Sequence, residues 1–256
     1  MKITVLTLFP SMFDGFKTNS IIKRAIGKGV VEFEAIDIRA YTKDKYGRTD
    51  TPPIGGGAGL VQKAQPIVDA IHAVKSENSH VVLMSPRGHT FDQKTAERFA
   101  KLDHLILVCG HYEGVDERVN DYCDELISIG DYILTGGEIP SMAIADSVIR
   151  LLDGAISKDS LNSESFDNDL LEYPQYTEPR EFEGSKVPDI LYSGNHTAIE
   201  KWRRKQSLSL TKKYRPDLFA KVPLSKADKK LLDELDSEET PKWELDAIEK
   251  GKKFMK

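Results

Sequence analysis

Three glycine-bearing turns are the parts of this sequence best suited to bind a small ligand. They read SPRG at residues 85–88, GHYEG at 110–114 and SIGDYILTGGE at 128–138, and each lies after or near a run of residues with strand character. Glycine leaves backbone N–H and C=O groups uncovered, so these turns can hydrogen-bond a planar base or a ribose. One such turn is as often a tight turn and nothing more, but three together favour a ligand-binding crevice.

Five carboxylates lie on or beside these turns. They could accept hydrogen bonds from a ligand or bind a hydrated Mg²⁺ ion, because this ion prefers oxygen ligands. Helix capping and solvated loop charge are the simpler alternatives, and an ion pair with Arg118 accounts equally well for the two acids just before it. The five residues are Glu113, Asp116, Glu117, Asp131 and Glu138.

The sequence has no pattern typical of a transition-metal site or a serine nucleophile. The six histidines form no HExxH motif, Cys109 and Cys123 lie in apolar surroundings, and GxSxG is absent. The glycine-rich stretch at 54–59 lacks the GxxxxGK[ST] pattern of a phosphate loop, so it favours a flexible loop over an active site. We therefore expect no disulfide and assign no metal ligand.

A dense basic run indicates a second chemistry, the binding of phosphates. Residues 201–215 read KWRRKQSLSLTKKYR, with seven bases, no acid and two aromatic residues. In a chain with 36 bases, 41 acids and a net charge of -5, this local field suits RNA or DNA, with aromatic rings stacking on the bases. A solvated helix face is the simpler alternative. Phosphate contacts are predicted for Arg203, Arg204, Lys205, Lys212, Lys213 and Arg215.

Composition excludes several classes of protein. With 256 residues, 39% hydrophobic and 30% charged, the chain has the composition of an ordinary globular protein. No apolar stretch approaches 18 residues and Pro10 interrupts the apolar N-terminus, so we expect neither a membrane span nor a signal peptide. Two cysteines suit a reducing compartment, and we expect the cytoplasm.

Alternating strand and helix patterns position the turns and predict an α/β fold with a mostly parallel sheet. Helices are expected over 66–75, 93–102 and 140–152, the second with a capping box formed by Thr90 and Gln93. Strands are expected over 3–8, 30–38, 80–85, 104–109 and 125–129.

The chain is predicted to divide into two domains. Residues 151–200 contain eleven acids and three bases, with several prolines, which marks a change in character. We expect a first domain at 1–156, a flexible linker at 157–171 and a smaller, mainly helical domain at 172–256. The helices of the second domain are expected over 196–208, 225–235 and 243–252.

These segments together resemble the bacterial tRNA (guanine-N(1))-methyltransferase family, of the SPOUT class of methyltransferases. The similarity covers nearly the whole chain and is carried by LFPSMF, GGGAG, SPRG, CGHYEGVDER, SIGDYILTGGEIPSMAIADSVIR, ESF, VPDILYSGNH and IEKWRRKQSL. It implies a deep trefoil knot in the first domain, an obligate homodimer with the active site between subunits, and S-adenosylmethionine bound within the knot. The implied partner is tRNA, with no membrane and no DNA.

The resemblance assigns roles to individual residues. Arg150 matches the family's catalytic arginine, and Glu164 stands where the family has its general base, an Asp directly before Ser-Phe. Glu178 and Leu210 replace two arginines of the family pattern, which removes two potential phosphate contacts. The positions that would contact the cofactor are Leu83, Gly110, Glu113, Ile129, Gly130, Tyr132, Leu134, Gly136 and Gly137.

The implied reaction transfers a methyl group from S-adenosylmethionine to N1 of the guanine at tRNA position 37, 3′ of the anticodon. N1 carries a proton at neutral pH, so methylation needs a base to remove it and positive charge to stabilise O6. Glu164 would take the proton, and Arg150 would offset the charge, with Mg²⁺ near Glu113 as a further candidate. The alternatives are a SPOUT enzyme acting on another RNA site and a non-enzymatic RNA-binding module.

Overall fold

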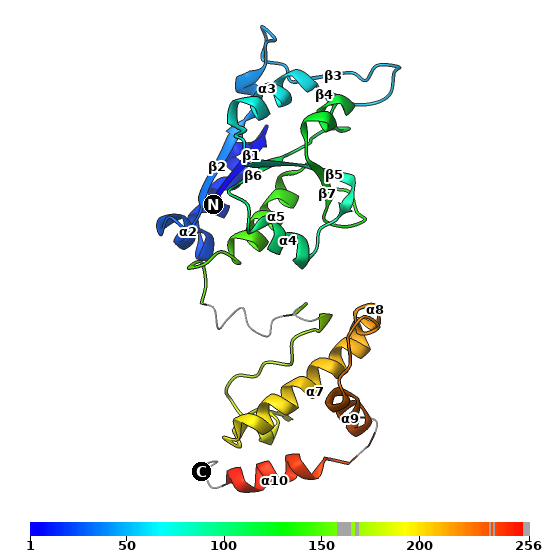
Figure 1. The fold of residues 1–256 in the computed structure, drawn as a ribbon. Coiled ribbons are helices and arrows are strands. Elements are labelled where there is room, and N and C mark those ends of the chain that lie inside the picture. Colours follow the sequence, from blue (N-terminus) through cyan, green and yellow to red (C-terminus); the bar gives the residue numbers. More distant parts are fainter. Residues whose placement is uncertain (158–164, 167–168, 236, 238, 253–256) are drawn as a thin grey trace. The chain divides into compact units, whose positions relative to one another are not determined.

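The chain folds into two compact units. The computed structural model describes residues 1–157, 165–166, 169–235, 237 and 239–252. An N-terminal unit, Met1–Lys158, and a C-terminal unit, Asp159–Lys256, each have hydrophobic clusters of their own (Figure 1). The predicted linker at 157–171 contains this boundary, and much of it lies outside the described residues.

The N-terminal unit is an α/β structure built on a parallel five-stranded sheet, as predicted. Its strands lie in the order β2-β1-β6-β5-β7, and a separate antiparallel pair joins β3 to β4. All five predicted strands form, but the third continues to Thr90 instead of ending at Ser85. The strands are β1 (Lys2–Thr7), β2 (Glu32–Asp37), β3 (Asp50–Thr51), β4 (Val61–Gln62), β5 (Ser79–Thr90), β6 (His104–Val108) and β7 (Glu125–Ser128).

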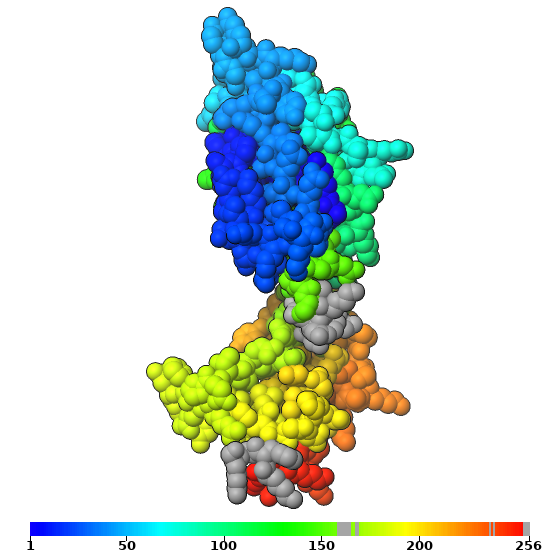
Figure 2. Space-filling model, turned by 90° about the vertical axis from the view of Figure 1, so that its left-hand side faces the viewer, coloured from blue at the N-terminus to red at the C-terminus, as the bar shows by residue number. Residues whose placement is uncertain are grey.

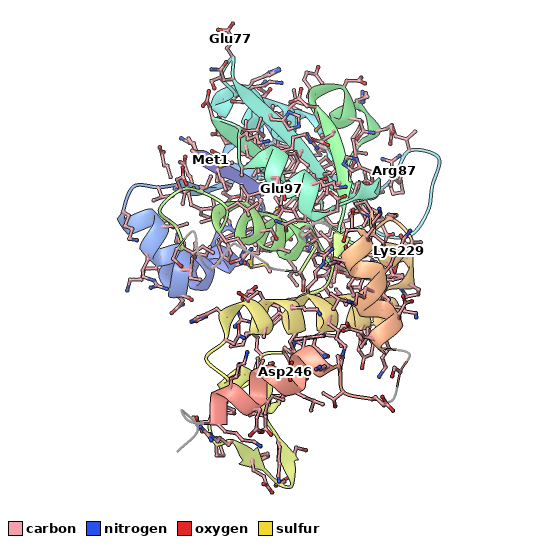
Figure 3. The ribbon with its side chains drawn as sticks, turned by 60° about the horizontal axis from the view of Figure 1, so that its bottom comes forward. Met1, Glu77, Arg87, Glu97, Lys229 and Asp246 are labelled. Atoms are coloured by element: carbon pink, nitrogen blue, oxygen red, sulfur yellow. The ribbon has the colours of Figure 1, made fainter. Side chains whose placement is uncertain are left out.

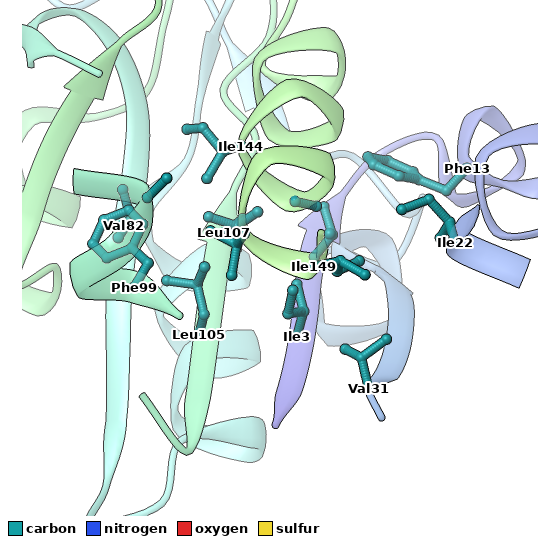
Figure 4. Packing of buried hydrophobic residues seen from close by; sticks show 14 of the residues in the cluster. Ile3, Phe13, Ile22, Val31, Val82, Phe99, Leu105, Leu107, Ile144 and Ile149 are labelled. Carbon is teal, nitrogen blue, oxygen red and sulfur yellow. The ribbon is translucent and has the colours of Figure 1, made fainter. Parts of the chain in front are cut away.

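Helices cover both faces of the main sheet. They are η1 (Pro10–Phe13), α1 (Asp14–Thr18), α2 (Ser20–Gly27), η2 (Ile38–Tyr41), α3 (Ala64–Val74), α4 (Gln93–Phe99), η3 (Glu117–Tyr122) and α5 (Glu138–Ile149). Leu105 and Leu107 of β6 pack in the layer with α2, α4 and α5, which Figure 4 shows. Ile106 and Val108 of the same strand pack in the opposite layer, with α3. Because both faces are covered, the strand is apolar from Leu105 to Val108 and shows no alternation there.

The start of α4 differs from the prediction. Its N-cap is Asp92, whose Oδ1 accepts hydrogen bonds from N and Oγ1 of Thr95 at 2.8 and 2.7 Å. The predicted cap, Thr90, is instead the last residue of β5 and pairs with Ser128 of β7. The capping-box prediction was wrong because the strand continues beyond the glycine turn and occupies the position that the cap would need.

The C-terminal unit is mainly helical. In the space-filling view, the yellow-green segment that contains its short hairpin stands out beside the yellow surface of the long helix α7 (Figure 2). This helix extends beyond the predicted 196–208 to Tyr214, because leucine and lysine favour the helix there. In the described part of the chain, no helix is long and apolar enough to cross a membrane. The elements are β8 (Glu181–Phe182), β9 (Ser185–Lys186), η5 (Asp189–Tyr192), α7 (His196–Tyr214), α8 (Pro216–Phe219), α9 (Lys226–Leu235) and α10 (Lys242–Gly251).

Candidate active site

Segments of the neighbouring strands β6, β5 and β7 meet around one cavity. The glycine turns after β6 and β7 therefore lie beside the turn at 85–88, which interrupts β5. They surround a cavity of about 590 Å³, which is within the range of small-ligand and cofactor sites. All nine residues predicted to contact a cofactor line it, namely Leu83, Gly110, Glu113, Ile129, Gly130, Tyr132, Leu134, Gly136 and Gly137.

The turn at 85–88 interrupts the pairing of β5 with β7. The register shifts after Met84, and the residues that follow leave the ladder and line the cavity. Gly88 lies directly on the backbone of β7, where the Cβ of any other residue would overlap it. Arg87, labelled in Figure 3, places Nη2 2.8 Å from Oε2 of Glu117, and this guanidinium lowers the pKa of Glu117.

The turn after β6 is attached to the small antiparallel sheet. The backbone N of His111 donates to Oε1 of Gln62 at 2.9 Å, and the N of Glu113 donates to the carbonyl of Leu60 at 3.0 Å. The Glu113 side chain also covers Gly59, where a Cβ would overlap its carboxylate. The glycine-rich stretch therefore ends against this turn, at the edge of the cavity.

The turn after β7 crosses the turn after β6. The N of Gly137 donates to the carbonyl of Gly110 at 2.8 Å, and a Cβ on Gly137 would lie 2.7 Å from the Cα of Cys109. Gly130 has a φ of 145°, and a Cβ there would lie 2.6 Å from the ring of Tyr132. These close approaches and this backbone conformation explain why the segment needs glycine.

The five carboxylates of the turns have different environments. Asp116 forms the ion pair with Arg118, with Oδ2 and Nη2 2.6 Å apart, and the guanidinium lowers the pKa of Asp116. Glu138 is 2% exposed and turns into the fold, while Glu113 and Glu117 line the cavity. Among the described residues, no group of three or more His, Cys, Asp or Glu side chains could hold a metal ion.

Several further residues of the cavity wall had no role predicted from the sequence. They include Met84, His111, Ile133, Thr135 and Pro140. All lie in or beside the glycine turns. The apolar ones, Met84, Ile133 and Pro140, carry no sequence signal that separates a ligand contact from ordinary packing. Their place within the turns is the signal that could have found them.

Arg150, predicted to be catalytic, lies away from this cavity. It is the C-cap of α5, and Pro140, the third residue of that helix, lines the cavity. With a rise of 1.5 Å per residue, about 15 Å of helix separates these two positions. Glu164, the predicted base, lies outside the described residues. The next residue, Ser165, accepts a hydrogen bond at its Oγ from the N of Glu172 at 3.0 Å.

Acids from α9 and α10 neutralise part of the basic run on α7. Nε of Arg204 donates to Oδ1 of Asp228 in α9 at 2.9 Å, and this arginine lowers the pKa of Asp228 to about 2. Lys205 is 7% exposed, with Nζ 3.8 Å from Oε2 of Glu244 in α10. The phosphate contact predicted for Lys205 does not fit this burial, because its ammonium group faces α10 and not solvent.

The most exposed bases of the run lie at its C-terminal end. Lys212 and Lys213 are exposed, and Nζ of Lys213 lies 4.9 Å from the ring centre of Tyr214, which is itself 60% exposed. Arg203 and Arg215 each form an ion pair with a nearby acid, at 2.6 and 2.7 Å. Such surface pairs exchange readily for another anion, because each stabilises the fold by about 1 kcal/mol or less.

Comparison with known proteins places the chain in a family. The sequence model described as tRNA (Guanine-1)-methyltransferase TrmD matches residues 1–221. A tRNA (guanine-N(1)-)-methyltransferase of Malacoplasma penetrans is 56% identical over 221 residues, which are 86% of this chain and 98% of the relative. Proteins of the same name from Dictyoglomus turgidum and Clostridium acetobutylicum are 52% and 53% identical, over 93% and 91% of this chain and 98% and 97% of the relatives. The chain therefore belongs to the tRNA (guanine-1)-methyltransferase family.

Proposed function

We propose that this protein transfers the methyl group of S-adenosylmethionine to N1 of the guanine at tRNA position 37, 3′ of the anticodon. The observation that carries the proposal is the family match over residues 1–221, joined to a cavity that gathers all nine predicted cofactor contacts. Transfer to N1 of guanine in tRNA is the activity named for the relatives.

The cavity has the chemistry that S-adenosylmethionine requires. Backbone groups of the glycine turns are open to hydrogen-bond an adenine and a ribose, and Leu83, Ile129 and Leu134 offer apolar cover. The carboxylate of Glu113 suits the positive charge of the ligand. The bound ligand supplies a methyl group activated by a sulfonium. The wall orients this group and excludes water from it.

The protein's own groups handle the proton and the charge of the guanine. Glu164 removes the proton from N1, and Arg150 stabilises the negative charge that develops on O6. Glu113 is the kind of single carboxylate that Mg²⁺ uses together with substrate oxygens, so a bound Mg²⁺ would offset the same charge. Measuring the single-turnover rate against Mg²⁺ concentration tests that contribution.

The position of Arg150 supports a homodimer with its active sites between subunits. About 15 Å of α5 separates Arg150 from the cavity wall of its own chain, a separation that exceeds the length of an arginine side chain. Arg150 of a second copy would complete the site. Large apolar side chains beside the cavity offer a surface for that copy, since Tyr132, Ile133 and Ile139 are 55%, 81% and 51% exposed.

The same proposal includes a trefoil knot around the cavity. The crossing of Gly137 over Cys109 and Gly110 supports it, because the turn after β7 passes directly across the backbone that follows β6. A knot would hold the three turns together without side-chain contacts between them.

The C-terminal unit would bind the tRNA. Lys212, Lys213 and the exposed ring of Tyr214 form the most open part of the basic run, and Arg203 and Arg215 can exchange surface ion pairs for phosphates. The partner is tRNA in the cytoplasm, and neither DNA nor a membrane is part of the proposal.

Mass mapping of one tRNA tests the function directly. After incubation of the protein with S-adenosylmethionine and that tRNA, we expect one added methyl group on the guanine 3′ of the anticodon. A methyl group at another position would support the alternative SPOUT enzyme. Absence of methylation, together with no thermal stabilisation by S-adenosylhomocysteine, would support the RNA-binding module, because a ligand that binds only the folded state must raise the melting temperature.

The role of the base is tested by Glu164→Gln, which keeps the size of the side chain and removes its basicity. We expect the single-turnover methyl-transfer rate to fall about a hundredfold while cofactor affinity stays the same. The controls are Asp167→Asn and Asp169→Asn, which neutralise the neighbouring acids. Full activity in Glu164→Gln with loss in either control would assign the base to that acid.

A further inference from the structure

A buried carboxylate lies behind the candidate cofactor cavity and links its own turn to two other segments. Glu138, the first residue of α5, is 2% exposed. Its Oε1 accepts a hydrogen bond from Oγ1 of Thr7, at the end of β1, at 2.8 Å. Its Oε2 lies 3.5 Å from Nδ1 of His111, in the turn after β6.

His111 connects this carboxylate to the cavity. Its ring packs 4.8 Å from the ring of Phe9, and His111 lines the cavity, whereas Glu138 is not part of the wall. The Nδ1 atom of His111 is buried and has no hydrogen-bond partner. A buried polar atom without a partner is costly, so a shift of a few tenths of an ångström toward Oε2 would be favourable.

The turn after β7, which ends at Glu138 itself, also contacts this pair. Gly136 lies against the pair, where a Cβ would overlap both Nδ1 of His111 and Oε2 of Glu138. His111 and Gly136 also form an isolated antiparallel bridge between the two turns. The distance between these turns, which is one dimension of the cavity, therefore depends on where the carboxylate holds the imidazole.

We propose that Glu138 is a positioning residue for the cofactor: anchored by Thr7, it orients His111 and so sets the spacing of the two turns that enclose the ligand. The inference rests on the proposed function, since it takes the cavity to be the S-adenosylmethionine site. Closing the gap of 3.5 Å between Nδ1 and Oε2 to hydrogen-bond length, about 2.9 Å, would draw the turn after β6 toward Gly136 and tighten the cavity. Glu138 acts entirely through His111 and Gly136.

The test compares Glu138→Gln with two variants of its partners. Glu138→Gln keeps the shape of the side chain and the acceptor for Thr7, but replaces one carboxylate oxygen. Thr7→Val removes the anchor, and His111→Phe keeps the ring against Phe9 and removes Nδ1. We expect each to raise the Kd for S-adenosylhomocysteine about tenfold in calorimetry, while the single-turnover rate at saturating S-adenosylmethionine falls less than about threefold.

A double-mutant cycle and a matched control separate positioning from stability. Glu138→Gln combined with His111→Phe should raise the Kd no more than either change alone, because residues of one unit are not additive. The control is Thr4→Val on the same strand, which removes the hydrogen bond of 2.9 Å between Oγ1 of Thr4 and Nε2 of His104. It should lower the melting temperature and leave the Kd unchanged.

Two results would overturn the inference. One is a Glu138→Gln variant with unchanged Kd and a lower melting temperature, which would make Glu138 a structural residue only. The other is an additive double variant, in which His111 would act without Glu138. If the unchanged protein does not bind S-adenosylhomocysteine, the proposed function fails and the inference fails with it. If the unchanged protein and Glu138→Gln bind it equally well, only the inference fails.

Discussion

The cavity of the N-terminal unit depends on glycine turns whose backbones lie in direct contact, whereas the candidate RNA surface of the C-terminal unit consists of long charged side chains. The crossing of Gly137 over Gly110 depends on the absence of a Cβ and on one backbone hydrogen bond of 2.8 Å. Three bases of α7 instead form ion pairs with acids of α9 and α10, namely Lys201, Arg204 and Lys205. A site formed by glycine turns can be recognised in the sequence, because the residues of each turn are consecutive. The charge that a surface offers to a ligand cannot, because it depends on ion-pair partners at distant positions in the chain.

Which bases of α7 are neutralised depends on which neighbouring helix each one faces. Lys205 faces α10 and is buried, and Arg204 meets Asp228 of α9. Lys212 and Lys213 lie beyond these contacts and are exposed. A count of seven bases therefore overstates the charge that this helix can offer to a phosphate.

The largest effect is expected for Lys205, which we assign to the interior of the C-terminal unit and not to its surface. Lys205→Glu should lower the unfolding free energy of the C-terminal unit by about 3–5 kcal/mol, because it places a second carboxylate beside Glu244 in a buried position. Urea denaturation followed by tryptophan fluorescence measures this, since both tryptophans, Trp202 and Trp243, lie in that unit.

Lys213→Glu is the matched control for that experiment. It should change the same free energy by less than about 0.5 kcal/mol, while reducing the salt dependence of tRNA binding by about one unit of slope. Equal losses of stability in the two variants would contradict the assignment of Lys205 to the interior.

Gly137→Ala tests whether the crossing of the two glycine turns requires the absence of a side chain. Its Cβ would lie 2.7 Å from the Cα of Cys109, so the two turns must separate, and we expect a loss of about 3 kcal/mol in the stability of the N-terminal unit. Circular dichroism during urea denaturation measures it. Gly110→Ala is the control, because its Cβ meets no atom closer than 3.4 Å, and a similar loss there would show that the crossing is not what requires glycine.

The ion pair between Arg204 and Asp228 should make the stability of the C-terminal unit depend on pH in acid. Because Arg204 lowers the pKa of Asp228 from 3.8 to about 2, its ionised form stabilises the C-terminal unit above pH 4, and this contribution is lost as the pH falls toward 2. Asp228→Asn should flatten the dependence of stability on pH in that window. The same slope in the variant and the unchanged protein, measured by tryptophan fluorescence, would place the acid sensitivity elsewhere.

The smallest effect is expected at the N-cap of α4, which is Asp92 and not the predicted Thr90. Asp92→Ala should cost about 1 kcal/mol of N-terminal stability, because Oδ1 caps α4. Thr90→Ala removes no cap and should cost less than about 0.5 kcal/mol. Denaturation of the two variants side by side measures the difference, and a larger loss in Thr90→Ala would restore the capping box that the sequence predicted.

The accuracy of the sequence predictions varied with the range of the interactions. The strands and glycine turns were predicted because their periodicity and conformational demands lie within a few residues. Thr90 was misplaced as a cap, since pairing with Ser128 of another strand decides its state. The burial of Lys205 could not be predicted for a similar reason, because its partner Glu244 comes from a separate helix.

The α/β class, the strands beside the glycine turns and the motifs that identify the family could be read from the sequence alone, because each depends on local pattern or on residue identity. Only the tertiary structure decided which carboxylates face the cavity. Asp116 pairs with Arg118 and Glu138 turns inward, while Glu113 remains on the wall. The physical reason is that burial and ion pairing are set by residues that folding brings together from distant positions, such as Thr7 beside Glu138.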